Sequence, residues 1–331
     1  KNGGTALKSN ANRESVLQKN QSYATEITDL TVEGNGVCHI QGMTVFVPHT
    51  APGDQVRVKI VKVCKQYAFG IIEEMEMPAS CRIESDCPYP ACGGCTFRHI
   101  SYAELQWKEK LVQDAFHRIG KLHPEFLPIV GGGQRSHYRN KAQYPVAVGA
   151  DGKPVCGFYA KRSHRVIPVR DCQLQPVLFQ QVLDVILQYV AEKSISVYQE
   201  ETGTGILRHI YLRQGWHTGE LMVCLVVRKP IERQLKGLIE RLTAAFPQVK
   251  SIVMNCNPAR TNVILGEKNV LLWGSETITD ILCGNRIFLS PHAFYQVNTE
   301  QAERLYGIAK EFAALQGTER LLDLYCGAGT I

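Results

Sequence analysis

The sequence predicts a multidomain protein: a small β-barrel, then an α+β domain, then the start of an α/β domain. Short β-like runs separated by turn signals fill residues 23–76. Helical and strand-like patterns then alternate over 77–285, and the chain closes on an apolar strand pattern that leads into a glycine turn. The expected divisions are a disordered tail at 1–22, a barrel at 23–76, a central domain at 77–285 and the beginning of a further domain at 286–331.

The composition allows a sizeable core and leaves the choice of partner open. Apolar residues make up 44% of the 331 residues, and the net charge of +6 permits a polyanionic partner without requiring one. The most apolar run, Leu221–Val227, is too short to span a membrane, and the N-terminus has no apolar signal region. We therefore expect a cytoplasmic protein, in which twelve cysteines indicate metal or cluster ligands rather than disulfides.

The first 76 residues predict five strands, at Tyr23–Leu30, Val37–Ile40, Met43–Val47, Gln55–Val63 and Tyr67–Glu74. Five short strands at this spacing fit an OB-like antiparallel barrel. In the fourth strand Arg57 and Lys59 alternate with apolar residues, so one face of the barrel is expected to be basic. Barrels of this kind often bind nucleic acid, and an ordinary solvated face is the alternative.

The rest of the chain predicts alternating helices and strands. A helix is expected over 101–120, with Ser101 and Glu104 as a capping box and Gly120 at its end. Thr299 is expected to cap the last helix. The other expected helices are Pro176–Glu192, Pro230–Phe246 and Thr299–Leu315, and the expected strands are Ser136–Val148, Ile206–Arg213, Glu220–Arg228, Ser251–Asn255, Thr261–Leu265, Asn285–Leu289 and Arg320–Tyr325.

Three cysteines within nine residues, Cys87, Cys92 and Cys95, predict a loop that wraps a metal centre. A fourth thiolate would complete a four-cysteine site. Cys172 is the best candidate, and Cys81 and Cys156 compete with it. Three close cysteines and a distant one favour an iron–sulfur cluster, and zinc is the alternative. The remaining cysteines in apolar segments are expected to be buried small residues: Cys38, Cys64, Cys224, Cys256 and Cys283.

The end of the chain predicts a nucleotide-side motif. Residues 321–325 read as a buried strand, and Gly327 and Gly329 would let a ligand approach the backbone at the end of that strand. An acidic residue such as Asp323 before Gly-x-Gly is typical of the first motif of methyltransferases that use S-adenosylmethionine. A dinucleotide site is the alternative that the pattern leaves open.

Together these parts resemble the bacterial RNA uracil-5-methyltransferases of the RumA (RlmD) and RlmCD type, over nearly the whole chain from Tyr23. The barrel resembles the family's TRAM domain, and the four cysteines resemble its ligands to a [4Fe–4S] cluster. The other matching segments are 138–141 (Tyr-Arg-Asn-Lys), 205–209 (Gly-Ile-Leu-Arg-His), 261–266 (Thr-Asn-Val-Ile-Leu-Gly), 294–298 (Phe-Tyr-Gln-Val-Asn) and 323–330, the first cofactor motif.

The resemblance implies methylation of uridine C5 in RNA, most readily 23S ribosomal RNA, with S-adenosylmethionine as the methyl donor. A cysteine thiolate would add to C6, C5 would take the methyl group, and a base would remove the C5 proton. The family's cysteine and glutamate for these steps would lie beyond Ile331, so we expect the 331-residue chain to be a truncated form without turnover. Cys326, in the glycine turn, is not expected to be the nucleophile.

The resemblance also implies site residues. Gln296, Tyr325, Gly327, Gly329 and Thr330 would bind S-adenosylmethionine. RNA contacts are expected from five basic residues: Arg57, Lys59, Arg139, Lys141 and Arg208. For Arg208 the alternative is a structural role within the central domain. Gln296 could instead cap the last helix. The helix at 101–120 could pack on the catalytic domain.

Two alternative functions remain. The tRNA-modifying relative is disfavoured because, within the family resemblance, it lacks the TRAM domain and the cluster cysteines. A non-catalytic RNA-binding iron–sulfur protein is the other. Radical methylthiotransferases also combine a TRAM domain with a cluster, but they place the barrel at the other end of the chain.

Overall fold

The computed structural model describes residues 17–102, 104–327 and 329. By internal contacts the chain divides into two compact units. The N-terminal unit holds Lys1–Pro88 and Cys95–Gly131, and the C-terminal unit holds Tyr89–Gly94 and Gly132–Ile331. None of the helices in the described residues has the length and apolar character needed to cross a membrane.

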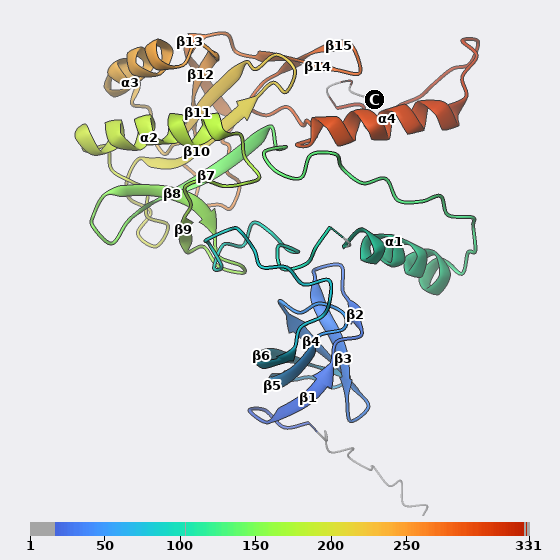
Figure 1. Cartoon of the computed structure of the whole chain (residues 1–331). Coiled ribbons are helices and arrows are strands. Elements are labelled where there is room, and N and C mark those ends of the chain that lie inside the picture. Colours follow the sequence, from blue (N-terminus) through green and yellow to red (C-terminus); the bar gives the residue numbers. More distant parts are fainter. Residues whose placement is uncertain (1–16, 103, 328, 330–331) are drawn as a thin grey trace, which may run out of the picture. The chain divides into compact units, whose positions relative to one another are not determined.

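The N-terminal unit is built on one six-stranded sheet with the order β1-β5-β6-β4-β3-β2 (Figure 1). Its strands are β1 (Ser22–Glu26), β2 (Asp29–Leu30), β3 (Asn35–Ile40), β4 (Met43–Pro48), β5 (Gln55–Val63) and β6 (Tyr67–Met77). β4 and β6 run parallel and the other pairs are antiparallel. Val45, Val58 and Ile60 alternate along β4 and β5 and are buried in its core, which is the period-2 pattern the sequence carries. The expected N-terminal β domain is therefore confirmed.

The expected tail over 1–22 extends too far. Residues 1–16 lie outside the described residues, but Leu17 is buried in the barrel core and the Asn20 amide donates to the Ile60 carbonyl at 2.8 Å. The chain therefore joins the barrel before Tyr23. Leu17 is a single buried apolar residue in a polar segment, so no periodic pattern predicted that this segment packs on the barrel.

The expected helix over 101–120 has two parts: helix α1 (Glu104–Asp114) and a π-helical turn, η1 (Ala115–Gly120). The Glu104 carboxylate accepts a hydrogen bond from Lys108 at 2.6 Å, an i,i+4 pair along the exposed helix. Lys121 follows in the left-handed conformation and ends the turn.

The C-terminal unit is built on a seven-stranded mixed sheet with the order β13-β12-β11-β10-β7-β8-β9. The strands are β7 (Lys141–Val148), β8 (Pro154–Tyr159), β9 (Val166–Pro168), β10 (Leu207–Gln214), β11 (Leu221–Val227), β12 (Val249–Cys256) and β13 (Lys268–Gly274). Only β11 and β12 pair in parallel. Helix α3 (Glu232–Ala245) provides the crossover that a parallel pair requires.

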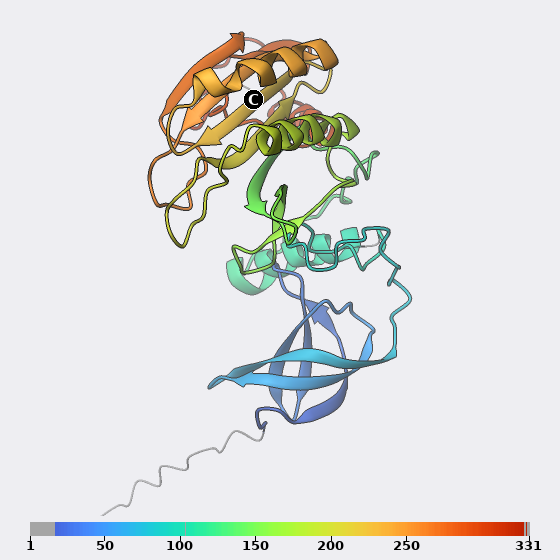
Figure 2. The same ribbon diagram turned by 90° about the vertical axis from the view of Figure 1, so that its left-hand side faces the viewer.

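Both faces of this sheet are covered, which explains why β11 is apolar along its whole length. Helices α2 (Val177–Glu192) and α3 pack on one face, and Figure 2 shows them side by side there. The opposite face packs against the hairpin of β14 (Ile278–Leu282) and β15 (Asn285–Leu289), and against Tyr295 and Ala302 at the start of α4 (Thr299–Ala313).

Several expected elements differ from the structure. The strand expected from Ser136 begins at Lys141, and β8, β13 and β14 were not predicted. Thr261–Leu265 is not a strand. The Asn257 side chain donates to the carbonyls of Val263 and Ile264 instead, so side-chain hydrogen bonds replace a sheet ladder in this segment.

Candidate functional site

The segment Phe294–Asn298, between β15 and α4, is anchored by its second residue, Tyr295. The buried Tyr295 hydroxyl donates to Asp280 Oδ2 at 3.0 Å. The buried Asp280 carboxylate also accepts the backbone N–H groups of Trp216 and His217, each at 2.9 Å. On either side of Tyr295, Phe294 and Gln296 are exposed. The segment thus presents an aromatic ring and an amide from a fixed backbone.

Asn140, just before β7, ties this segment to the sheet. Its buried side chain donates to the Gln296 carbonyl at 2.7 Å and to Thr299 Oγ1 at 2.9 Å. Its backbone N–H donates to the Val297 carbonyl at 2.9 Å. The position of Gln296 is therefore set by a residue more than 150 positions earlier in the chain.

Arg213 on β10 supports the same segment from its other end. Its side chain is 1% exposed and donates to the carbonyls of Ser290 (2.8 Å) and Ala293 (2.7 Å). A buried guanidinium without a carboxylate partner is costly, and two carbonyl acceptors offset only part of that cost. Burial lowers the pKa of Arg213. Arg213 was not among the residues predicted for the site, although an arginine directly after the apolar run 210–212 was a signal.

Positive charge gathers at the start of β7. Lys141 lies opposite Arg213 in the strand register, and Arg139 forms a backbone bridge with Asn298. Burial lowers the pKa of Lys141, and the nearby charges of Arg213 and Arg139 lower it further. Among the described residues, neither Arg139 nor Lys141 has a carboxylate within 4 Å. This arrangement favours an anionic ligand at the start of β7.

The helix cap differs from the expectation. Asn298, rather than Thr299, caps α4: its side chain accepts the Gln301 N–H at 3.2 Å. Thr299 accepts from Asn140 instead. Gln296 therefore does not serve as the cap, and its exposed amide remains available for a ligand.

The strand expected at Arg320–Tyr325 is absent from the described residues. Leu322 is 79% exposed and Tyr325 is 91% exposed, although the sequence suggested a buried strand. An apolar parallel strand needs neighbouring strands to pair its backbone, and none pairs with it in the described part of the chain. The glycine turn does form: Gly327 and Gly329 have positive φ, and the Gly329 N–H donates to the Cys326 carbonyl at 2.7 Å. Thr330 lies outside the described residues.

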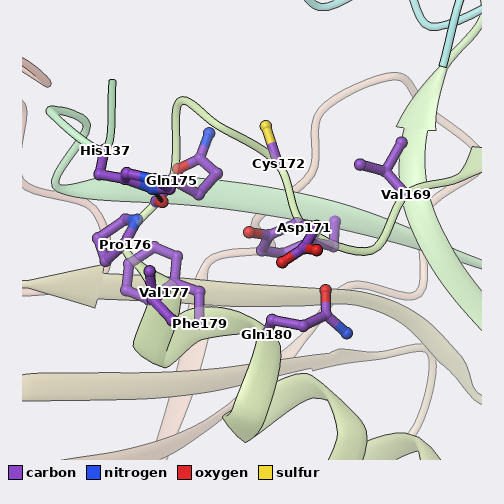
Figure 3. A pocket seen from close by; sticks show the side chains of 10 residues that line it. His137, Val169, Asp171, Cys172, Gln175, Pro176, Val177, Phe179 and Gln180 are labelled. Carbon is purple, nitrogen blue, oxygen red and sulfur yellow. Dashed lines mark hydrogen bonds between the residues drawn. The ribbon is translucent and has the colours of Figure 1, made fainter. Parts of the chain in front are cut away.

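Two of the four predicted ligand cysteines come together in the C-terminal unit. Cys92 and Cys172 pack on the same apolar cluster, with Val169 and Ala160 among its buried members. The Gly94 N–H lies 3.4 Å from Cys92 Sγ and can donate to it. Cys172 lies on the loop between β9 and α2 and lines a small pocket with His137 and Gln175 (Figure 3).

Cys87 and Cys95 belong to the N-terminal unit. Among the described residues, no group of three or more His, Cys, Asp or Glu side chains is arranged to hold a metal ion.

The competing cysteines have other surroundings. Cys156 is buried in the main core, and burial raises the pKa of its thiol to about 12, which disfavours a thiolate ligand. The Cys81 thiol lies 3.8 Å from the Pro52 carbonyl, and burial raises its pKa. Cys38, Cys224 and Cys256 are buried as expected, whereas Cys64 is half-buried and Cys283 is exposed. Cys283 occupies the β14–β15 turn with positive φ, which explains its exposure.

The predicted RNA-binding residues fall into three groups. Arg208 is buried and donates to the carbonyls of Asn257, Ala259 and Thr261, contacts of the kind that its structural alternative requires. Arg57 forms ion pairs with Glu74 (3.7 Å) and Glu76 (3.0 Å) on β6, and these offset its charge. Lys59, Arg139 and Lys141 have no ion pair among the described residues.

A known domain family matches the barrel. Residues 17–72 match the TRAM domain family, in agreement with the six-stranded unit.

The whole chain then resembles RNA methyltransferases. It is 42% identical to an RNA methyltransferase of Halalkalibacterium halodurans over 96% of this chain and 70% of the relative. It is 40% identical to one of Listeria monocytogenes over the same shares, and 39% identical to one of Bacillus cereus over 95% and 69%. The chain belongs to this family of RNA methyltransferases, and the family resemblance noted in the sequence is confirmed.

A solved structure shares the fold. The tRNA (uracil-54, C5)-methyltransferase of Pyrococcus abyssi, in complex with S-adenosyl-L-homocysteine, superposes with a TM-score of 0.69 and 24% identity. The match covers 93% of this chain and 68% of the Pyrococcus abyssi chain.

Proposed function

We propose that this RNA methyltransferase transfers a methyl group from S-adenosylmethionine to C5 of uridine, with 23S ribosomal RNA as the substrate. The observation that carries the proposal is the exposed Gln296 on a segment that Asn140 ties to the start of β7, where Arg139 and Lys141 lie. Arg213 supports the same segment. The fold shared with a uracil-C5 methyltransferase that binds S-adenosyl-L-homocysteine, the product form of the donor, supports the same chemistry.

The residues predicted for the site have the following parts in this proposal. Gln296 would bond the polar groups of the donor, and the positive-φ Gly327 and Gly329 would let its amino-acid part approach the backbone. Tyr325 and Thr330 complete the proposed set. Arg139 and Lys141 would take RNA phosphates, and Lys59 would do so on the barrel. The target uridine must leave its stack before its C5 can reach the donor.

The methyl transfer itself needs a nucleophile and a base. A thiolate that adds to C6 makes C5 enolate-like, so that C5 can attack the methyl group on sulfur. Loss of the C5 proton to a base then expels the thiolate and restores the ring. Cys326, in the exposed glycine turn, is not assigned the nucleophile's role.

We propose further that Cys87, Cys92, Cys95 and Cys172 hold a [4Fe–4S] cluster. Cys92 and Cys172 share one apolar cluster, and Cys92 Sγ lies next to the Gly94 N–H, a contact that stabilises thiolate ligands. Cys87 and Cys95 are five and three residues from Cys92, which bounds their Cα distances from it to roughly 17 Å and 10 Å. In this family of sites a cluster supplies structural cross-linking or electron transfer.

Iron and sulfide analysis of anaerobically purified protein tests the cluster. About four iron and four sulfide per chain are expected for a cubane. Cys172→Ala should lose iron while the matched control Cys156→Ala keeps it. Stoichiometric zinc without sulfide would contradict the proposal, and full iron retention in Cys172→Ala would exclude Cys172 as a ligand.

A tRNA substrate is the second candidate, and a specific observation favours it. The Pyrococcus abyssi enzyme acts on tRNA and covers 93% of this chain, so the match extends into the barrel unit. The presence of the barrel therefore does not indicate whether the substrate is ribosomal RNA or tRNA. Incubation of the protein expressed from its complete gene with S-adenosylmethionine and either 23S ribosomal RNA or tRNA, followed by nucleoside mass spectrometry, decides between them. We expect 5-methyluridine in ribosomal RNA, and 5-methyluridine only in tRNA would refute the ribosomal assignment.

A further inference from the structure

The β8–β9 hairpin ends in a basic tip, residues 161–165 (Lys-Arg-Ser-His-Arg), and all five residues are exposed. The tip has a fixed shape because Ser163 Oγ accepts the Arg165 N–H at 2.9 Å and the Ala160 N–H donates to the Arg165 carbonyl at 2.9 Å. Among the described residues, Lys161, Arg162 and Arg165 have no carboxylate within 4 Å. Three exposed cations on a hydrogen-bonded turn favour a polyanionic partner.

Two flat rings lie next to these cations. The Tyr159 and His164 rings stack with centroids 5.2 Å apart and planes 27° apart. Glu200 holds them: it accepts from Tyr159 OH at 3.4 Å and lies 2.7 Å from His164 Nδ1. Single-stranded nucleic acids bind to surfaces that combine positive charge for phosphates with aromatic faces for bases. The hairpin tip combines both features.

The cysteine loop supports this tip directly. Cys92 forms an antiparallel bridge with Ala160, and the Gly93 N–H donates to the Tyr159 carbonyl at 2.9 Å. A Cβ added at Gly93 would lie 2.8 Å from both the Tyr159 carbonyl oxygen and the Lys161 nitrogen. Because these are backbone atoms, any side chain at Gly93 would push the loop and the tip apart.

We propose that the hairpin tip 161–165 is a contact surface for single-stranded RNA, and that the loop of Cys92 and Gly93 holds the tip in position. The inference rests on the proposed function, since RNA is the polyanion that an RNA methyltransferase must bind. Lys161, Arg162 and Arg165 contact phosphates, and Tyr159 with His164 offers a stacking face for a base. The cysteine loop then serves RNA recognition as well as ligand binding.

The charge of the tip is tested with the double variant Lys161→Gln/Arg162→Gln. Binding of a fluorescent, uridine-rich single-stranded RNA is measured by anisotropy across a salt series. Loss of two phosphate contacts should lower the salt-dependence slope by about 1.4 and weaken binding roughly tenfold at physiological salt. Arg233→Gln/Lys236→Gln, two exposed cations on α3, is the matched control and should bind as the wild type does.

The support from the loop is tested without changing charge. Gly93→Ala should weaken RNA binding several-fold. Gly94→Ala should not, because a Cβ there meets only Cys92 Sγ at an ordinary 3.5 Å. Wild-type affinity and slope in the double variant would overturn the RNA surface, and equal affinities in the two glycine variants would overturn the positioning role. Both experiments measure RNA binding rather than methyl transfer. A failure of the proposed function, seen as absent methyl transfer, is therefore distinguishable from a failure of the proposed RNA surface.

Discussion

The substitution Asn140→Leu tests whether the proposed donor-binding segment is held by the central sheet. Leucine has nearly the shape of asparagine but removes the two side-chain hydrogen bonds to the Gln296 carbonyl and Thr299 Oγ1. Each such bond contributes about 0.5–1.5 kcal/mol, and leaving the buried Thr299 hydroxyl without this partner adds to the loss. The C-terminal unit should therefore lose about 2–4 kcal/mol of unfolding free energy.

Urea unfolding followed by tryptophan fluorescence measures this loss. The chain has three tryptophans, and a Trp107→Phe background leaves Trp216 and Trp273, both in the C-terminal unit, as the reporters. Asn285→Leu, at the exposed start of β15, is the control and should change the free energy by less than about 0.5 kcal/mol. If Asn140→Leu is as stable as this control, Asn140 does not tie the segment to the sheet.

Three further outcomes follow from other buried groups. Burial, followed by the charge of Arg208, lowers the pKa of His209 to about 4 from 6.5. Below pH 6.5 the imidazole binds a proton in the unfolded chain but not in the folded chain, so acid favours unfolding. Between pH 7 and pH 5 the wild type should therefore lose about 2 kcal/mol more unfolding free energy than His209→Asn. Parallel pH profiles of the two proteins would contradict this. Arg208→Lys should lower stability, because it loses the fork that holds three carbonyls, and should leave RNA affinity unchanged; weaker RNA binding by a folded variant would restore Arg208 as an RNA contact. Lys141→Gln should weaken RNA binding without lowering stability, since burial disfavours its charge and no carboxylate offsets it; unchanged affinity in fluorescence anisotropy would refute its role.

The barrel was predictable because its strands alternate apolar and polar residues at short intervals. Val56, Val58 and Ile60 all face the core, and turns at glycine and asparagine separate the strands. Its basic face was less predictable. The glutamates that pair with Arg57 come from the neighbouring strand, and only the register of β5 against β6 brings them together.

The site was predictable in its residues but not in its supports. The motif 294–298 located Gln296, but the asparagine and arginine that hold it lie more than 80 positions earlier in the chain. Such ties depend on the packing of segments distant in sequence, which local patterns do not encode. The prediction of a last strand was wrong for the same reason. Leu321 and Leu322 have the composition of a buried strand, but among the described residues no strand pairs with them.

The fate of the C5 hydrogen of uridine tests the central claim most directly. RNA labelled with tritium at C5 of uridine is incubated with S-adenosylmethionine and the protein expressed from its complete gene. Methylation at C5 must expel the hydrogen on that carbon, so tritium should enter water in step with methyl groups gained by the RNA. Methyl incorporation without tritium release would place the methyl group elsewhere and contradict the account.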